Sequence, residues 1–145
     1  VSRKQWDNFL HPNALEKDSY FIENMKAIAD NGQLRLIDTD TELCPDIDLR
    51  LFDGHTPGQI VPYIHTPEQT FVFAGDVIPL AASVSPEWIS AYDTFPVTSY
   101  QEKVRMLEKA AREGQVLIYC HDAYTRCSTV KKVNDFFKKD KTIEI

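Results

Sequence analysis

The stretch Asp53-Gly54-His55-Thr56-Pro57-Gly58 decides how this chain is interpreted. Glycine before the histidine and Pro57-Gly58 after it predict a tight turn that presents the imidazole at a fixed position. Two later segments show a related pattern, in which an apolar run stops at a polar side chain. The run from Phe71 ends at Asp76, and the run from Val116 ends at His121.

These runs predict strands, and polar residues at strand ends are candidates for a shared site. Strand ends are rigid, so side chains from neighbouring ends can converge on one point. Two imidazoles and one carboxylate suit zinc or a similar divalent ion. We therefore predict that His55, Asp76 and His121 are metal ligands. For each residue alone a simpler alternative stays open: His55 as a surface histidine, Asp76 as a cap of backbone amides, and His121 as a core histidine.

Other polar residues near these segments receive weaker predictions. Asp122 can act from a second layer, orienting an imidazole as carboxylates do for ligating histidines. His11 and His65 are predicted to be exposed and inert. On a continuing strand Cys120 points away from His121, which predicts a core thiol and forbids a nucleophile pair between these neighbours.

Composition excludes several classes of protein. A chain of 145 residues with 43% hydrophobic content predicts a single unit, residues 1–145, with a real core. The net charge of −6 and the absence of a basic stripe argue against nucleic-acid binding. No apolar run approaches the ~20 residues that span a bilayer, and the start lacks the apolar segment of a signal peptide. Three cysteines without a CxxC motif favour reduced thiols and a cytoplasmic protein.

Apolar spacing predicts three helices. One covers residues 2–10 behind Ser2 as N-cap, and one begins at Asp18 or Ser19 and stops at Asn31-Gly32. The apolar face of this second helix is predicted to comprise Phe21, Ile22, Met25, Ile28 and Ala29. The third runs from a Ser99 cap to Gly114. Its predicted inward residues are Tyr100, Val104, Leu107, Ala110 and Ala111, and its predicted outward residues are Glu102, Lys103, Arg105, Glu108 and Lys109.

Alternating and fully apolar runs predict the strands, which cover residues 34–37, 47–52, 59–64, 70–74 and 116–120. Residues 38–45 are predicted to be a polar turn, and 59–64 is expected to pair antiparallel with 70–74. The irregular segment 77–96 is expected to line a substrate pocket, with Trp88 and Tyr92 as pocket walls or as core. The tail, 128–145, fits either a helix or a hairpin turning near Asn134-Asp135. A helix followed by a buried strand is typical of an α/β protein.

These motifs resemble the C-terminal portion of the metallo-β-lactamase superfamily, which carries a GHTPG turn, a strand ending in GD and a last strand ending in HD. Here they are Gly54–Gly58, Gly75-Asp76 and His121-Asp122. The resemblance includes the Ser2 to Trp6 opening and Ala91-Tyr92-Asp93, and it covers nearly the whole chain.

The resemblance implies one half of an αββα sandwich: a mixed, mostly antiparallel sheet with helices on one face. It implies that His55 binds a first metal, His121 binds a second, and Asp76 bridges the two, with Zn²⁺ expected at both positions. It further implies hydrolysis of an ester, lactone, thioester, β-lactam or phosphotriester by a metal-activated hydroxide. It also favours the hairpin for the tail.

The chain departs from the family in one respect that matters. The HxHxDH motif, which holds the remaining metal ligands, is absent from all 145 residues. We therefore expect a C-terminal fragment that is inactive or nearly so alone, whose partners are a small-molecule substrate and the missing N-terminal half. The alternatives are a half-domain that binds a partner chain or forms a homo-oligomer through an apolar sheet face, and a mononuclear metal-binding module with Cys127 as a further ligand. Nucleic acid and membrane are not expected partners.

Overall fold

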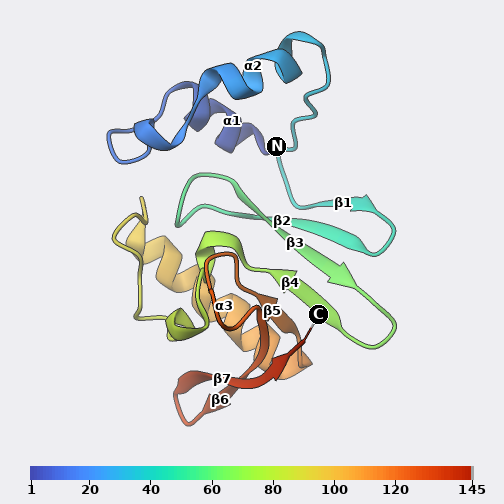
Figure 1. Cartoon of the computed structure of the whole chain (residues 1–145). Coiled ribbons are helices and arrows are strands. Elements are labelled where there is room, and N and C mark those ends of the chain that lie inside the picture. The colour runs from blue at the N-terminus through green and yellow to red at the C-terminus, as the bar shows by residue number, and fades with distance from the viewer. Residues whose placement is uncertain (145) are drawn as a thin grey trace.

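The computed structural model describes residues 1–144, and its centre is a seven-stranded mixed sheet (Figure 1). The strands lie in chain order, and neighbours are antiparallel except β4 and β5, which are parallel. Their bounds are β1 (Thr41–Cys44), β2 (Ile47–Phe52), β3 (Gln59–His65), β4 (Thr70–Phe73), β5 (Val116–Ile118), β6 (Cys127–Val133) and β7 (Phe136–Ile143). The predicted class, a mixed sheet with helical cover, is confirmed.

The long helix α3 (Pro96–Glu113) makes the crossover between β4 and β5 and packs on one face of the sheet (Figure 1). It starts at Pro96 with Phe95 as N-cap, three residues before the predicted Ser99 cap, because proline is favoured in the first turn. Its Leu107 joins a buried cluster with Val72 and Leu117 of the sheet. The crossover places the ends of β4 and β5 side by side, which positions the residues that follow each strand.

The N-terminal helices lie at the end of the molecule away from α3 (Figure 1). Helix α1 (Arg3–Leu10) follows the predicted Ser2 cap, whose hydroxyl accepts a hydrogen bond from the Gln5 amide at 3.0 Å. Helix α2 (Ile22–Asp30) begins after Phe21 instead of at Asp18 or Ser19, which lie in a separate 3₁₀ turn. No side chain of α2 is fully buried, so its predicted apolar face has no core beneath it.

One predicted strand and one predicted turn are wrong. Residues 34–37 form no strand, and Ile37 makes only an isolated bridge to Ser2. Part of the predicted turn 38–45 is instead β1, a polar edge strand paired with β2. The segment 34–37 instead bonds to the chain start through the backbone of Ile37, and β1 lacks an apolar pattern because most of it faces solvent.

The tail is a hairpin of β6 and β7 that turns at Asn134, whose φ is 53°. This confirms the hairpin and excludes the helix for residues 128–143, while Ile145 lies outside the described residues. Helix periodicity misleads here because both strands are near the sheet edge, where polar and apolar residues do not alternate regularly.

The sheet face opposite α3 is apolar and partly exposed. Val61 and Tyr63 of β3 belong to the cluster under α3, so alternation places Ile60, Pro62 and Ile64 on the other face. Their register partners extend this surface onto β2 and β4: Ile47, Leu49 and Leu51 on β2, and Phe71 on β4. These side chains are half-buried, and Phe73 beside them is 39% exposed. Within residues 1–144, no helix combines the length and apolarity needed to cross a membrane.

Candidate metal centre

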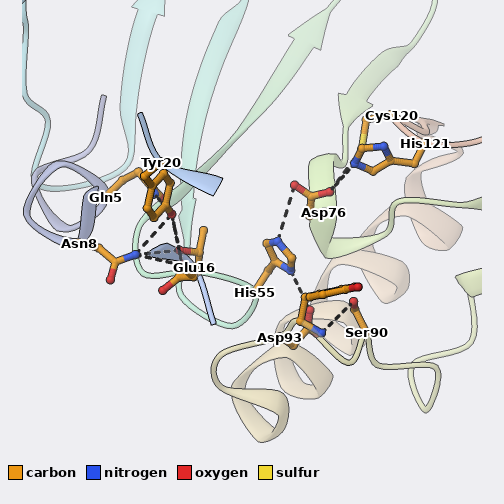
Figure 2. A network of polar contacts seen from close by, with 12 residues as sticks. Gln5, Asn8, Glu16, Tyr20, His55, Asp76, Ser90, Asp93, Cys120 and His121 are labelled. Atoms are coloured by element: carbon orange, nitrogen blue, oxygen red, sulfur yellow. Dashed lines mark hydrogen bonds and ion pairs between the residues drawn. The ribbon is translucent and has the colours of Figure 1, made fainter. Parts of the chain in front are cut away.

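The three predicted metal ligands lie together at one rim of the sheet (Figure 2). The Asp76 carboxylate is between the two imidazoles. Its Oδ1 is 2.9 Å from Nε2 of His121, and its Oδ2 is 3.7 Å from Nε2 of His55. One oxygen therefore faces each histidine, which is the arrangement that a carboxylate shared by two ions requires.

The His55 turn is fixed by contacts from distant segments. The Ser2 hydroxyl donates to the Gly58 carbonyl at 2.6 Å, and the Gly58 amide donates to Asp53 at 2.9 Å. Gly58 has φ of +74°, and a Cβ there would collide with the Ser2 side chain. Glycine is thus required by backbone conformation and by space. These contacts explain why the turn presents His55 in one orientation.

Asp93 sets the orientation of the His55 ring. Its Oδ1 is 2.8 Å from His55 Nδ1, and its side chain is only 5% exposed (Figure 2). This hydrogen bond raises the pKa of His55, an effect that burial opposes and the Asp76 charge reinforces. It leaves Nε2 to face Asp76, as a carboxylate behind a metal-binding histidine does. The sequence alone gave Asp93 no role.

Two charged residues of α3 hold the loops that meet at His55. Glu102 and Lys103 are only 6% and 1% exposed, so the prediction that they point outward is wrong. The Glu102 carboxylate accepts the amides of Asp53 and Gly54, each at 2.9 Å.

The Lys103 ammonium donates to carbonyls of the segment that leads to Asp93, at 2.8 to 3.1 Å. The acceptors are Ser83, Ser85 and Trp88. Helical spacing assigns charged residues to solvent, but Glu102 and Lys103 bond to backbone groups that would otherwise stay unpaired.

The His121 side of the centre is more open. Asp76 follows β4 in a short 3₁₀ turn, and His121 follows β5, with its amide donating to the Pro79 carbonyl at 3.1 Å. The His121 side chain is 66% exposed, against 21% for His55.

Asp122 does not orient an imidazole among the described residues. Its carboxylate accepts the backbone amides of Ala81, Tyr124 and Thr125, and these bonds lower its pKa. It therefore shapes the loop after His121, and Asp93 takes the place that was predicted for it.

Cys120 belongs to the rim, so its prediction as a core thiol is wrong. It is exposed, and its Sγ donates to Asp76 Oδ1 at 3.7 Å. Strand β5 ends at Ile118, so the alternation that would turn Cys120 and His121 to opposite faces no longer applies. Burial and the Asp76 charge raise the pKa of this thiol to about 11.

A cavity of about 650 Å³ opens beside the centre. His55, Asp76 and His121 line it, and Glu16 and Tyr20 line it from the N-terminal region. Glu16 is 8% exposed and accepts hydrogen bonds from Asn8 and Tyr20, so the N-terminal region contributes an ordered polar network to the cavity (Figure 2).

Trp88 and Tyr92 are exposed, at 67% and 73%, and are not core. Tyr92 lines this cavity, and Trp88 lines an adjoining one. The expectation that segment 77–96 contributes pocket walls therefore agrees with the positions of both aromatic residues.

The donor set fits a divalent transition metal. Imidazole nitrogens and a carboxylate oxygen suit zinc, and His55 has a buried carboxylate behind it. When bound, such a cation lowers the pKa of a coordinated water and polarises a carbonyl or phosphoryl group. His55 and His121 would each bind through Nε2, and Asp76 through either oxygen.

Comparison with known proteins agrees with this geometry. The model of the metallo-beta-lactamase superfamily matches residues 2–121. The chain therefore belongs to the metallo-β-lactamase superfamily. Among curated proteins, none matches the chain by sequence.

Solved structures share the fold. A probable metal-dependent hydrolase from Staphylococcus aureus is 24% identical with a TM-score of 0.84, and the match covers 99% of this chain and 52% of that one. The hydrolase AbOPH of the beta lactamase superfamily is 16% identical with a TM-score of 0.83, covering 100% of this chain and 54% of its own. AidC, a dizinc quorum-quenching lactonase, is 18% identical with a TM-score of 0.77, at 100% and 54% coverage. The chain thus spans about half the length of these structures.

Proposed function

We propose that the chain supplies part of the centre of a metal-dependent hydrolase, with lactones and related esters as the first substrate classes to test. The observation that carries this proposal is the Asp76 carboxylate placed between His55 and His121 at 3.7 and 2.9 Å. Superfamily membership supports hydrolysis, and the similarity to AidC, a dizinc lactonase, supports the substrate class and the expectation of zinc.

The protein groups have separable roles in this proposal. Asp93 fixes the His55 ring, Glu102 and Lys103 fix the two loops that meet there, and Asp76 keeps one oxygen toward each histidine. The cavity beside the centre is proposed to admit a substrate, and Tyr20 and Tyr92 are among the residues that line it. The polar side chains of the centre next to these aromatic residues suit a ligand with both a carbonyl function and an apolar part.

Full activity is proposed to need ligands from outside these 145 residues. Two imidazoles and one carboxylate do not complete two zinc sites, which need about four ligands each including water. The apolar face opposite α3 supports docking of the segment that carries the remaining ligands. The chain alone is then inactive or nearly so.

The test compares the zinc-loaded chain with the complete product of its natural reading frame, using a panel of lactones, esters and phosphotriesters. We expect hydrolysis by the complete product, loss of hydrolysis in its His55→Ala variant, and none by the chain alone. A complete product that binds zinc but hydrolyses no member of the panel would contradict the hydrolase proposal. Turnover by the chain alone at ordinary enzyme rates would contradict the need for further ligands.

Self-association is a second candidate function, favoured by the same apolar face. Exposed apolar patches of this kind mark interaction surfaces. Analytical sedimentation of the chain, and of a variant with Phe73→Ser and Ile60→Ser, tests whether this face mediates self-association. A dimer that becomes monomeric in the variant supports self-association, whereas a wild-type monomer contradicts it.

A further inference from the structure

We propose that Cys120 is a metal ligand and that Asp76, Cys120 and His121 form a carboxylate–thiolate–imidazole site for zinc or a similar thiophilic cation. This inference deepens the proposed function, since it rests on metal binding at the same rim. It adds a ligand that neither the sequence motifs nor the superfamily match assigns.

The three donor atoms already have the spacing of a metal site. One donor atom from each residue lies within 4.8 Å of the other two. Tetrahedral zinc with bonds of about 2.0 Å to nitrogen or oxygen and about 2.3 Å to sulfur holds its ligand atoms roughly 3.5 Å apart. The distances from Asp76 Oδ1, 2.9 Å to His121 Nε2 and 3.7 Å to Cys120 Sγ, are close to that separation.

The backbone holds the donors in place. Strands β4 and β5 pair in parallel up to Phe73 and Ile118, so the donors follow adjacent strand ends. Beyond the pairing, the Tyr119 amide donates to the Arg126 carbonyl at 2.9 Å and the His121 amide donates to the Pro79 carbonyl at 3.1 Å. Cys120 lies between these two bonds. Ligands on such a fixed backbone need only small side-chain rotations to close on an ion.

The orientation of the side chains favours a metal over a catalytic thiol. In a nucleophile triad, the imidazole lies between the thiol and the carboxylate and bonds one with each nitrogen. Here Cys120 Sγ and His121 Nε2 both face the same oxygen, Asp76 Oδ1. Groups that converge on one point suit a cation placed among them. A thiolate and a carboxylate together also balance the charge of a divalent ion.

The test is Co²⁺ binding to the purified chain, followed by absorption spectroscopy, because cobalt bound to a thiolate shows a charge-transfer band in the near ultraviolet. We expect this band in the wild type and in Cys44→Ser. In Cys120→Ser we expect the band to be lost and the affinity for Co²⁺ to be at least about tenfold weaker than in the wild type. Cys44 is the matched control, because it is exposed on β1 and belongs to no such cluster of ligands among residues 1–144. Circular dichroism verifies that each variant is folded.

A second measurement uses the three cysteines of one molecule. The chain is treated with iodoacetamide with and without Zn²⁺, and each site is quantified by mass spectrometry. We expect Zn²⁺ to protect Cys120 at least tenfold and to leave Cys44 unprotected, while buried Cys127 stays unmodified in both samples.

The outcomes separate this inference from the proposed function. Cobalt binding that is lost in His121→Ala but lacks the charge-transfer band and is unchanged in Cys120→Ser would overturn the role of Cys120 and leave the metal centre standing. Absence of Co²⁺ and Zn²⁺ binding by the folded wild-type chain would overturn this inference, whereas the hydrolase proposal would still be decided by zinc binding and hydrolysis in the complete product.

Discussion

The two histidines of the centre differ in how the protein holds them. The His55 side chain is 21% exposed and its ring bonds to Asp93, which is 5% exposed. The His121 side chain is 66% exposed, and its one side-chain hydrogen bond within the described residues is the one to Asp76. The fold therefore holds the His55 ring through the buried Asp93, whereas the more open His121 ring is held through its hydrogen bond to Asp76.

The source of this asymmetry is α3. Its adjacent residues Glu102 and Lys103 bind two different loops, both of which precede the helix in the sequence, and those loops meet at His55 and Asp93. Among the described residues, no α3 side chain hydrogen-bonds the loop that follows β5, and Asp122 organises this loop locally. The helix therefore supports one side of the centre.

The largest expected effect comes from Asp76, the residue that both sides share. Asp76→Ala removes the ligand between the imidazoles, and we expect Zn²⁺ affinity to fall by about a hundredfold or more, beyond the effect of losing an outer partner. Calorimetric titration measures the change. The control is Asp140→Ala, whose carboxylate pairs with Lys131 far from the rim. Affinity within threefold of the wild type would show that the shared carboxylate is not a ligand.

The next prediction contrasts Asp93, which bonds to His55, with Asp122, which bonds only to backbone amides among the described residues. Asp93→Asn weakens the support of His55, so we expect Zn²⁺ affinity to fall by roughly 10- to 100-fold. Asp122→Asn should change affinity by less than about threefold, because its carboxylate meets backbone amides. A larger loss for Asp122 than for Asp93 would reverse the assignment of these roles.

A third change tests the α3 contacts through stability. Glu102→Gln replaces a buried carboxylate that accepts two amides, and we expect the free energy of unfolding to fall by about 2 kcal/mol. Urea unfolding measures it. Glu108→Gln on the same helix is the control, since its pair with Lys132 is half exposed, and we expect a change within about 0.5 kcal/mol. Equal effects at the two positions would contradict the role of Glu102.

The smallest effect is a pH dependence from Lys103. Burial lowers the pKa of Lys103 from 10.5 to about 8. Between these values the unfolded chain binds more protons than the folded protein, so the contribution of Lys103 to stability rises with pH. The difference in unfolding free energy between the wild type and Lys103→Met should therefore grow between pH 8 and 10.5. A difference that stays flat across this pH range would contradict the desolvation of Lys103.

The sequence predicted the convergence of His55, Asp76 and His121 because each follows an apolar run, and strand ends in a sheet meet at one edge. It did not predict the buried Glu102 and Lys103, because periodicity assigns charges to solvent. Their partners are backbone groups 15 to 49 residues away, which only the folded chain brings near. Cys120 was misplaced for a related reason, since alternation was extended two residues past the true end of β5. Asp93 lies in irregular backbone, where spacing carries no signal.

The central claim is that one ion-binding rim uses His55 and His121 and neither of the other histidines. Side-chain ¹H–¹⁵N NMR of the four imidazoles during a Zn²⁺ titration tests it most directly. We predict that the Nε2 resonances of His55 and His121 shift on adding Zn²⁺, while His11, at the end of α1, and His65, bonded to Asp48 and Thr70, stay unchanged. Shifts at His11 or His65 with none at His55 and His121 would contradict the claim.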